Sequence, residues 1–100
     1  MSKLVRDLIP EIIPKEKIDN YKFTTVNGEE YERLLKEKLI EEINEFLEAE
    51  NLEELADVFE VLESIMKLKN FTYDALNKVK LAKKISRGGF EKQLLMEVKK

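Results

Sequence analysis

The sequence predicts a mainly α protein, an antiparallel helical bundle core of three main helices with up to two short peripheral strands. Leucine, glutamate and lysine dominate the 100 residues, and only three glycines and two prolines are present to break helices. Apolar residues recur at helical spacing through three segments, and the connections between these segments are short. The length fits a single domain spanning residues 1–100.

The first quarter of the chain is expected to hold one turn of helix and one strand. The segment "DLIPEIIPK", residues 7–15, predicts a short helical turn with Pro10 near its start and Pro14 at its end. The segment "YKFTTV", Tyr21 to Val26, is rich in aromatic and β-branched residues. Since Asn27-Gly28 follows it as a turn signal, we expect a short strand there.

Three longer segments are predicted to form helices. They run from about Glu29 to Ala49, from about Leu52 to Lys69 and from about Thr72 to Ser86. Asn51 is a favourable N-cap for the second helix, and Thr72 or Asn70 for the third. The sequence Arg87-Gly88-Gly89 is expected to end the third helix. The tail "FEKQLLMEV" is the candidate for a second strand, beside the first.

The composition excludes several classes of site. The chain has no cysteine and no histidine, which removes disulfides, thiolate metal sites, the usual zinc ligand and every Ser-His or Cys-His nucleophile. No apolar run approaches the length of a membrane span, and the start "MSKLVRDLIP" lacks the apolar core of a signal peptide. We therefore expect a cytoplasmic protein with no membrane partner.

Charge is distributed unevenly along the chain. Residues 1–66 carry eight basic and eighteen acidic side chains, whereas residues 67–100 carry ten basic and three acidic ones. The net charge of −3 argues against a general nucleic-acid surface, which needs a basic domain. The pattern fits a ligand that needs both a metal and cationic side chains, such as a polyphosphate. A solvated lysine face on the last helix is the alternative.

The acidic segment from Leu39 to Ile65 is the most informative part of the sequence. It holds ten Asp or Glu residues and no Lys or Arg. At about 100° per residue, Glu42 falls inside the apolar arc of the first long helix, with Glu45 at its edge. In the second helix, Glu54 falls inside the arc and Asp57 borders it. Because a short connection makes the two helices antiparallel, these two pairs of carboxylates are expected to face each other.

Four carboxylates in one place need a counter-charge. Two charges about 5 Å apart repel by roughly 3 kcal/mol at an effective dielectric of about 20. Protonation relieves part of this repulsion, and a divalent cation relieves more. Oxygen ligands without His or Cys favour Mg2+ or Mn2+ over zinc, and Mg2+ sites usually serve phosphate chemistry. The alternative is a solvated acidic face, with Glu54 completing a capping box that begins at Asn51.

The same residues carry a resemblance to a known family. The stretch "EEINE", Glu41 to Glu45, followed by "ELAD", Glu54 to Asp57, is similar to the EExxE…ExxD signature of the all-α nucleoside triphosphate pyrophosphohydrolases, the MazG-like superfamily. The opening "KLVRDLIPEIIPK" and the ending "AKKISRGGFEKQLLMEV" also resemble its small phosphoribosyl-ATP pyrophosphohydrolase-like branch. The resemblance covers nearly the whole chain. One departure is that only eight residues separate Glu45 from Glu54, which shortens the connecting turn.

The resemblance implies a metal centre and a reaction. The implied Mg2+ ligands are Glu42, Glu45, Glu54 and Asp57. Water would attack between the α and β phosphates of a nucleoside triphosphate, giving a nucleoside monophosphate and pyrophosphate. The implied catalytic residues are Glu42 and Glu41. Since Glu41 lies off the apolar arc, it would bind the metal through water or activate water.

Cationic side chains are expected to contact the β and γ phosphates. The candidates are Lys83, Lys84 and Arg87 at the end of the third helix, with Lys3 and Arg6 in the opening motif. Arg87 is preferred because the backbone of Gly88-Gly89 lets a phosphate approach, whereas each lysine taken alone has a solvated position as its alternative. The nucleotide base would stack on an aromatic ring, for which the candidates are Tyr21, Phe23, Tyr73 and Phe90.

The expected partners are a small-molecule nucleotide and further copies of the chain. Members of the family commonly assemble as dimers or tetramers, so the resemblance implies a homodimer or homotetramer. Helices this apolar would also leave an uncovered face in a single copy. Two alternatives stay open. One is a non-catalytic nucleotide-binding regulatory module on the same fold, and the other is a helical oligomerisation module whose acids are solvated.

Overall fold

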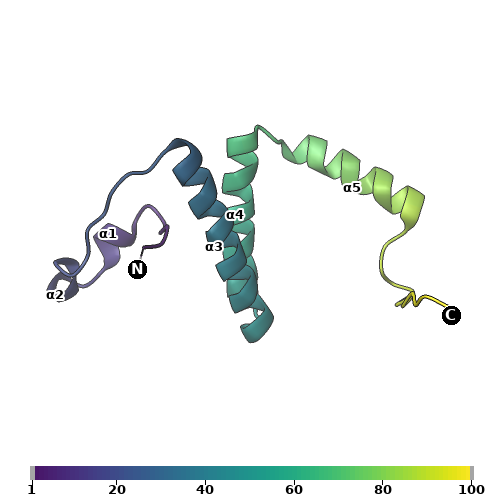
Figure 1. Ribbon diagram of the computed structural model, residues 1–100, viewed down its shortest axis with the longest axis horizontal. Helices are drawn as coiled ribbons and strands as arrows, with labels where there is room; N and C mark the ends of the chain where they lie inside the picture. Colours follow the sequence, from purple (N-terminus) through teal and green to yellow (C-terminus); the bar gives the residue numbers. More distant parts are fainter. Residues whose placement is uncertain (1, 100) are drawn as a thin grey trace. The chain divides into compact units, whose positions relative to one another are not determined.

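The computed structural model describes residues 2–99 and is mainly helical, which confirms the predicted fold class (Figure 1). The chain divides into two compact units, Met1–Lys69 and Asn70–Lys100. The first unit contains α1 (Ile9–Ile12), α2 (Lys15–Ile18), α3 (Gly28–Ala49) and α4 (Leu52–Lys69), and the second contains α5 (Tyr73–Arg87). The predicted bounds of the three long helices are therefore confirmed to within one residue. No helix of the described residues is long and apolar enough to cross a membrane.

Helices α3 and α4 pack against each other as an antiparallel hairpin (Figure 1). The connection is two residues long because both helix ends are closed locally. Glu50 ends α3 in the left-handed conformation, with φ of 51°, and its N–H donates to the carbonyl of Phe46 at 2.7 Å. Asn51 begins α4, since its Oδ1 accepts a hydrogen bond from the N–H of Glu54 at 2.9 Å. The predicted N-cap at Asn51 is confirmed.

The buried residues of the first unit lie where the two helices meet. Leu35, Val58 and Val61 are the buried apolar residues, and Glu42 is buried with them. The N-terminal residues lie along one side of this hairpin, where Leu4, Val5 and Ile9 are half-buried. Glu42 is an exception to the rule that core positions are apolar, so its buried carboxylate marks the hairpin as a candidate site.

The predicted helical turn near the N-terminus is confirmed as α1, with Pro10 in its first turn. Pro14 follows α1, as predicted, and is also the N-cap of α2. The predicted strand at residues 21–26 is wrong, since the described residues contain no strand at all. A strand needs a hydrogen-bonded neighbour, and β propensity without a partner is not sufficient.

The second unit consists of α5 and the segment that follows it. Thr72 caps α5, with its Oγ1 accepting from the N–H of Ala75 at 3.1 Å, and Gly88 ends the helix with φ of 81°. Both predictions are confirmed. The second predicted strand is wrong, because the tail begins with a turn in which the N–H of Gln93 donates to the carbonyl of Phe90. Every described residue from 70 to 99 is exposed, so this unit has no buried core in a single copy.

Candidate metal centre

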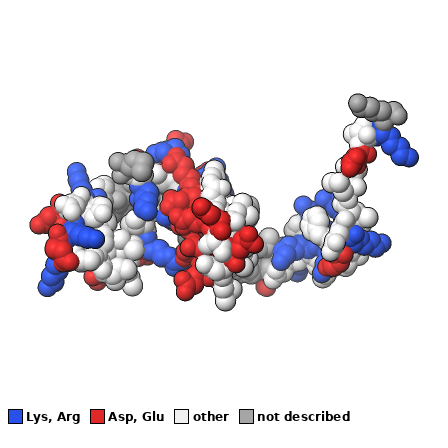
Figure 2. All heavy atoms as spheres, turned by 90° about the horizontal axis from the view of Figure 1, so that it is seen from below, with Lys and Arg blue, Asp and Glu red and all other residues white. Residues whose placement is uncertain are grey.

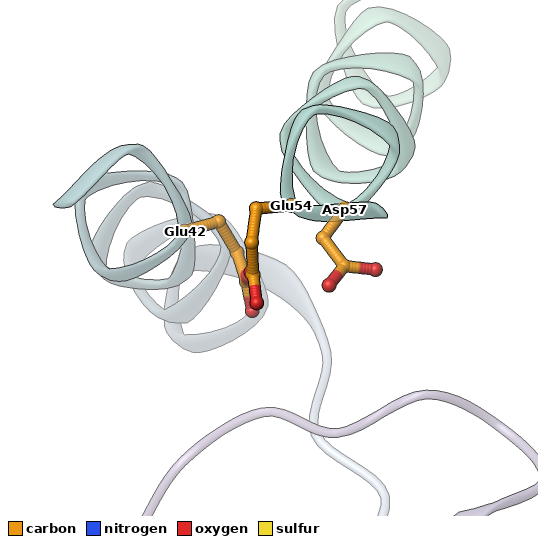
Figure 3. A group of neighbouring side chains, drawn as sticks. All are labelled: Glu42, Glu54 and Asp57. Carbon is orange, nitrogen blue, oxygen red and sulfur yellow. The ribbon is translucent and has the colours of Figure 1, made fainter. Parts of the chain in front are cut away.

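Three carboxylates meet between α3 and α4. Glu42 comes from α3, while Glu54 and Asp57, one helical turn apart on α4, come from the facing side. One oxygen from each of the three lies within 4.8 Å of the others. Figure 3 shows the three side chains reaching from the two helices into the same space. We call Glu42, Glu54 and Asp57 the acidic triad.

Two oxygens of the acidic triad are buried and have no hydrogen-bond partner, namely Oε2 of Glu42 and Oε2 of Glu54. The side chain of Glu42 is only 9% exposed. Burial raises the pKa of Glu42, and the nearby charge of Glu45 adds to this effect. A buried polar group without a partner costs about 1–3 kcal/mol. The unpartnered oxygens therefore mark a position where a cation would be stabilised.

Two basic side chains from outside the acidic segment reach the triad. Lys38 Nζ lies 3.2 Å from Glu42 Oε1, and Arg6 Nη2 lies 2.6 Å from Asp57 Oδ1. Partial burial alone would lower the pKa of Lys38, but hydrogen bonds to Glu42 and Glu41 outweigh it and raise the pKa. Lys38 precedes Glu42 by four residues on the same helix, so helical spacing alone could have predicted this ion pair. Arg6 is 51 residues from Asp57, and no local pattern predicts that pair.

The lack of basic residues between Leu39 and Ile65 is therefore not a lack of counter-charge. Lys38 and Arg6 each pair with one oxygen of the triad, and Lys38 also pairs with Glu41, whereas the triad carries three carboxylates. Lys38 and Arg6 together leave Glu54 without a cationic partner among the ion pairs of the described residues. The triad keeps a formal charge of about −1 when all its groups are ionised, which is the physical reason a divalent ion still fits.

The structure brings together three of the four predicted metal ligands. The fourth, Glu45, is exposed and lies outside the triad, although its charge is close enough to act on Glu42. Glu41 is half-buried on the other side of Lys38, with its Oε1 3.3 Å from Lys38 Nζ. The capping-box alternative predicts that the side chain of Glu54 turns back toward Asn51. Instead, its buried Oε2 is unpartnered and faces the triad.

The five predicted phosphate contacts fall into two groups. Arg6 contacts the triad directly, and Lys3 Nζ lies 3.8 Å from Glu41 Oε1. The other three, Lys83, Lys84 and Arg87, are exposed on α5 in the second unit. Lys38, which the sequence reasoning did not select, is the best-buried cation beside the triad, with a side chain 16% exposed.

Acidic side chains are also concentrated on the surface of the α3–α4 hairpin. In the face shown in Figure 2, Asp and Glu side chains gather over the α3–α4 hairpin. Such a surface raises the local concentration of cations.

Comparison with models of protein families, with curated proteins and with solved structures finds no match to this chain. The resemblance to the MazG-like superfamily therefore stays a prediction that depends on the motif residues and on the geometry of the triad.

Proposed function

We propose that the protein is a nucleotide pyrophosphohydrolase that uses Mg2+, or Mn2+, to hydrolyse nucleoside triphosphates between the α and β phosphates. The single observation that supports this proposal is that Glu42 and Glu54, which meet in the acidic triad from two helices, each keep a buried carboxylate oxygen without a hydrogen-bond partner. All-oxygen ligand sets of this kind suit hard divalent ions.

The residues of the triad would hold the ion, and each has a distinct environment. Glu42 and Glu54 offer buried oxygens, while Asp57 is more exposed and shares its Oδ1 with Arg6. When bound, the ion would neutralise charge on the phosphate oxygens and acidify water. Arg6 and Lys38 are positioned to contact the phosphates, since each already bonds a carboxylate at the edge of the triad.

In the proposed reaction, water forms a bond to one phosphorus of the α–β bridge and the bridging P–O bond breaks. The proton of the water passes to a carboxylate, and Glu41 is the candidate. Glu41 is outside the triad, half-buried, and held near it by Lys38. The products are a nucleoside monophosphate and pyrophosphate.

A second candidate function is nucleotide binding without turnover. The observation in its favour is that Arg6 and Lys38 occupy carboxylate oxygens of the triad. A nucleotide could then be held by these cations while the carboxylates stay paired with them.

A pyrophosphate-release screen over nucleoside triphosphates with Mg2+ tests both candidates. We expect hydrolysis by the wild type, and its loss in Glu42→Gln and Asp57→Asn. The control variant is Glu48→Gln, which changes an exposed carboxylate on the same helix outside the triad and should keep full activity. Binding without hydrolysis would support the second candidate. If neither Mg2+ nor any nucleotide changes the melting temperature, both candidates are wrong and an oligomerisation module remains.

We further propose that the protein is a homodimer or homotetramer. Exposed apolar side chains follow one flank of the hairpin at helical spacing; on α3 they are Ile40, Ile43 and Leu47, and on α4 they are Leu52, Phe59 and Leu62. At 100° per residue, this flank lies on the opposite side of the hairpin from Lys38 and Asp57. A second copy could cover it without blocking the triad.

A further inference from the structure

A cavity of about 550 Å³ lies between the N-terminal segment and the α3–α4 hairpin. Its walls are mostly apolar, and they include Leu8, Ile9 and Ile12 on one side and Tyr31 and Val61 on the other. Binding sites for small organic molecules typically have volumes of about 300–1,000 Å³, with apolar walls and a few polar groups. The size and lining of this cavity fall in that class.

Two members of the acidic triad, Glu42 and Asp57, line the cavity, and so do their cations, Lys38 and Arg6. Asp7 and Glu60 add two more carboxylates to the lining. The cavity therefore combines an apolar part with a charged part that contains two cations and four carboxylates. A molecule that fits both parts has an apolar, ring-shaped body and an anionic head. The cations complement that head, and a divalent ion on the carboxylates would also complement it.

We infer that this cavity holds the nucleoside part of a nucleotide whose phosphates lie at the acidic triad. This inference depends on the proposed function, because it says where the base of the same nucleotide binds. The ring of Tyr31 supplies an aromatic wall on which a base can stack. Ser64 also lines the cavity. Its hydroxyl donates to the carbonyl of Glu60 at 3.2 Å, so its oxygen can accept a hydrogen bond from a base.

The aromatic residues expected from the sequence to stack on the base do not line this cavity. Tyr21 and Phe23 face each other, with ring centroids 6.4 Å apart, and neither is among the lining residues. Tyr31, which lines the cavity, was not among the residues expected to stack on the base. Since Tyr31 is only half-buried beside the open cavity, its ring is available to a ligand.

The absence of tryptophan from the chain gives a direct test. Leu8→Trp places a single tryptophan at the wall of the cavity, and Leu81→Trp places one on α5, outside both the cavity and the exposed apolar flank of the hairpin. Leu8 is 63% exposed and Leu81 is 60% exposed, so the two variants are matched and neither disturbs the buried core. Each variant is titrated in Mg2+ with the four common nucleoside monophosphates and with inorganic phosphate.

We expect at least one nucleoside monophosphate to change the emission of Leu8→Trp, while phosphate does not and Leu81→Trp does not respond. Calorimetry on the wild type should show that this nucleotide binds at least tenfold more tightly than inorganic phosphate. If the indole fills the cavity instead of reporting on it, binding to Leu8→Trp should weaken at least threefold relative to Leu81→Trp. Ile12→Trp, at another exposed position of the wall, provides a second reporter.

The inference is overturned if a nucleotide binds all three variants with wild-type affinity and without a change in emission. That result leaves the proposed function intact, since it means only that the base lies elsewhere. If the wild type binds no nucleotide in Mg2+, the inference and the proposed function fail together.

Discussion

Replacing Glu42 by glutamine should stabilise the protein without metal and weaken its response to metal. Glu42 Oε1 accepts from Lys38 Nζ at 3.2 Å, and its Oε2 is buried without a partner. The amide oxygen of glutamine can keep the contact with Lys38. The amide N–H of glutamine can donate to a carboxylate of Glu54 or Asp57 in the triad, where Glu42 brings only a repelling oxygen.

The magnitude follows from the distances in the triad. Glu54 and Asp57, at up to 4.8 Å, each repel Glu42 by about 3 kcal/mol at an effective dielectric of about 20, while Lys38 at 3.2 Å attracts it by about 5 kcal/mol. Repulsion by these two carboxylates therefore exceeds the attraction slightly. Burial, which raises the pKa of Glu42, adds to the cost of its charge. We expect Glu42→Gln to gain about 1–2 kcal/mol in the free energy of unfolding at neutral pH without metal.

This gain should depend on pH in a defined direction. Because the pKa of Glu42 is raised by burial, the folded protein binds this proton more tightly than the unfolded chain does. The stability that this group contributes is fully present below its ordinary pKa of 4.5, and it is lost as the pH rises through the raised value. The advantage of Glu42→Gln over the wild type should therefore be largest above neutral pH and should disappear near pH 4.5.

Urea unfolding followed by circular dichroism measures these differences with and without Mg2+. At a metal concentration of about 100 times Kd, the wild type should gain about 2.7 kcal/mol. Glu42→Gln should gain no more than about 1.4 kcal/mol, because its affinity is at least tenfold weaker. The control, Glu48→Gln, should match the wild type within about 0.5 kcal/mol in both buffers. The reasoning is refuted if Glu42→Gln is less stable than the wild type in chelator at pH 7.5, or if it keeps the full response to Mg2+.

Three other changes should have separate effects. Arg6→Gln removes from Asp57 an exposed ion pair worth about 0.2–1 kcal/mol. Calorimetry should therefore show that the variant binds Mg2+ up to about fivefold more tightly and binds nucleotide more weakly. Unchanged affinities would exclude a role for Arg6. Glu50→Gly should raise the free energy of unfolding by about 1 kcal/mol because glycine adopts the left-handed conformation of Glu50 without strain, and a lower melting temperature would contradict this. Ile43→Glu should convert the oligomer to monomers in sedimentation velocity, a prediction that fails if the wild type already sediments as a monomer.

The helices could be predicted from the sequence because their signals are local. The hairpin is defined by apolar spacing on α3 and α4 and by the cap at Asn51, and all of these act over a few residues. The inward positions of Glu42 and Glu54 follow from the same spacing. The predicted strand at residues 21–26 failed because a strand depends on a distant partner, which its own composition cannot supply.

The counter-charges of the triad were beyond local reasoning for a related reason. The contact between Arg6 and Asp57 exists only because the N-terminal segment lies beside the hairpin, which no periodicity in either segment specifies. Lys38 could have been found, since it precedes Glu42 by one helical turn, but it stands just outside the acidic segment. Glu45 and Asp57 both stood at the edge of an apolar arc, so periodicity did not distinguish them, and the structure leaves Glu45 exposed.

The pairing of the triad with Arg6 and Lys38 has a consequence for how metal and nucleotide would bind. An ion that binds the carboxylates of Asp57 and Glu42 competes with the two cations for the same oxygens. The cations that it displaces are then free to bond phosphate oxygens, which would otherwise have to compete with the carboxylates for them. Binding of the metal therefore increases the affinity for nucleotide, and by thermodynamic linkage nucleotide increases the affinity for the metal by the same factor. On the proposed function, Mg2+ alone should bind weakly and should bind more tightly when a nucleotide is present, so the same contacts that lower the affinity for free metal favour the metal–nucleotide complex.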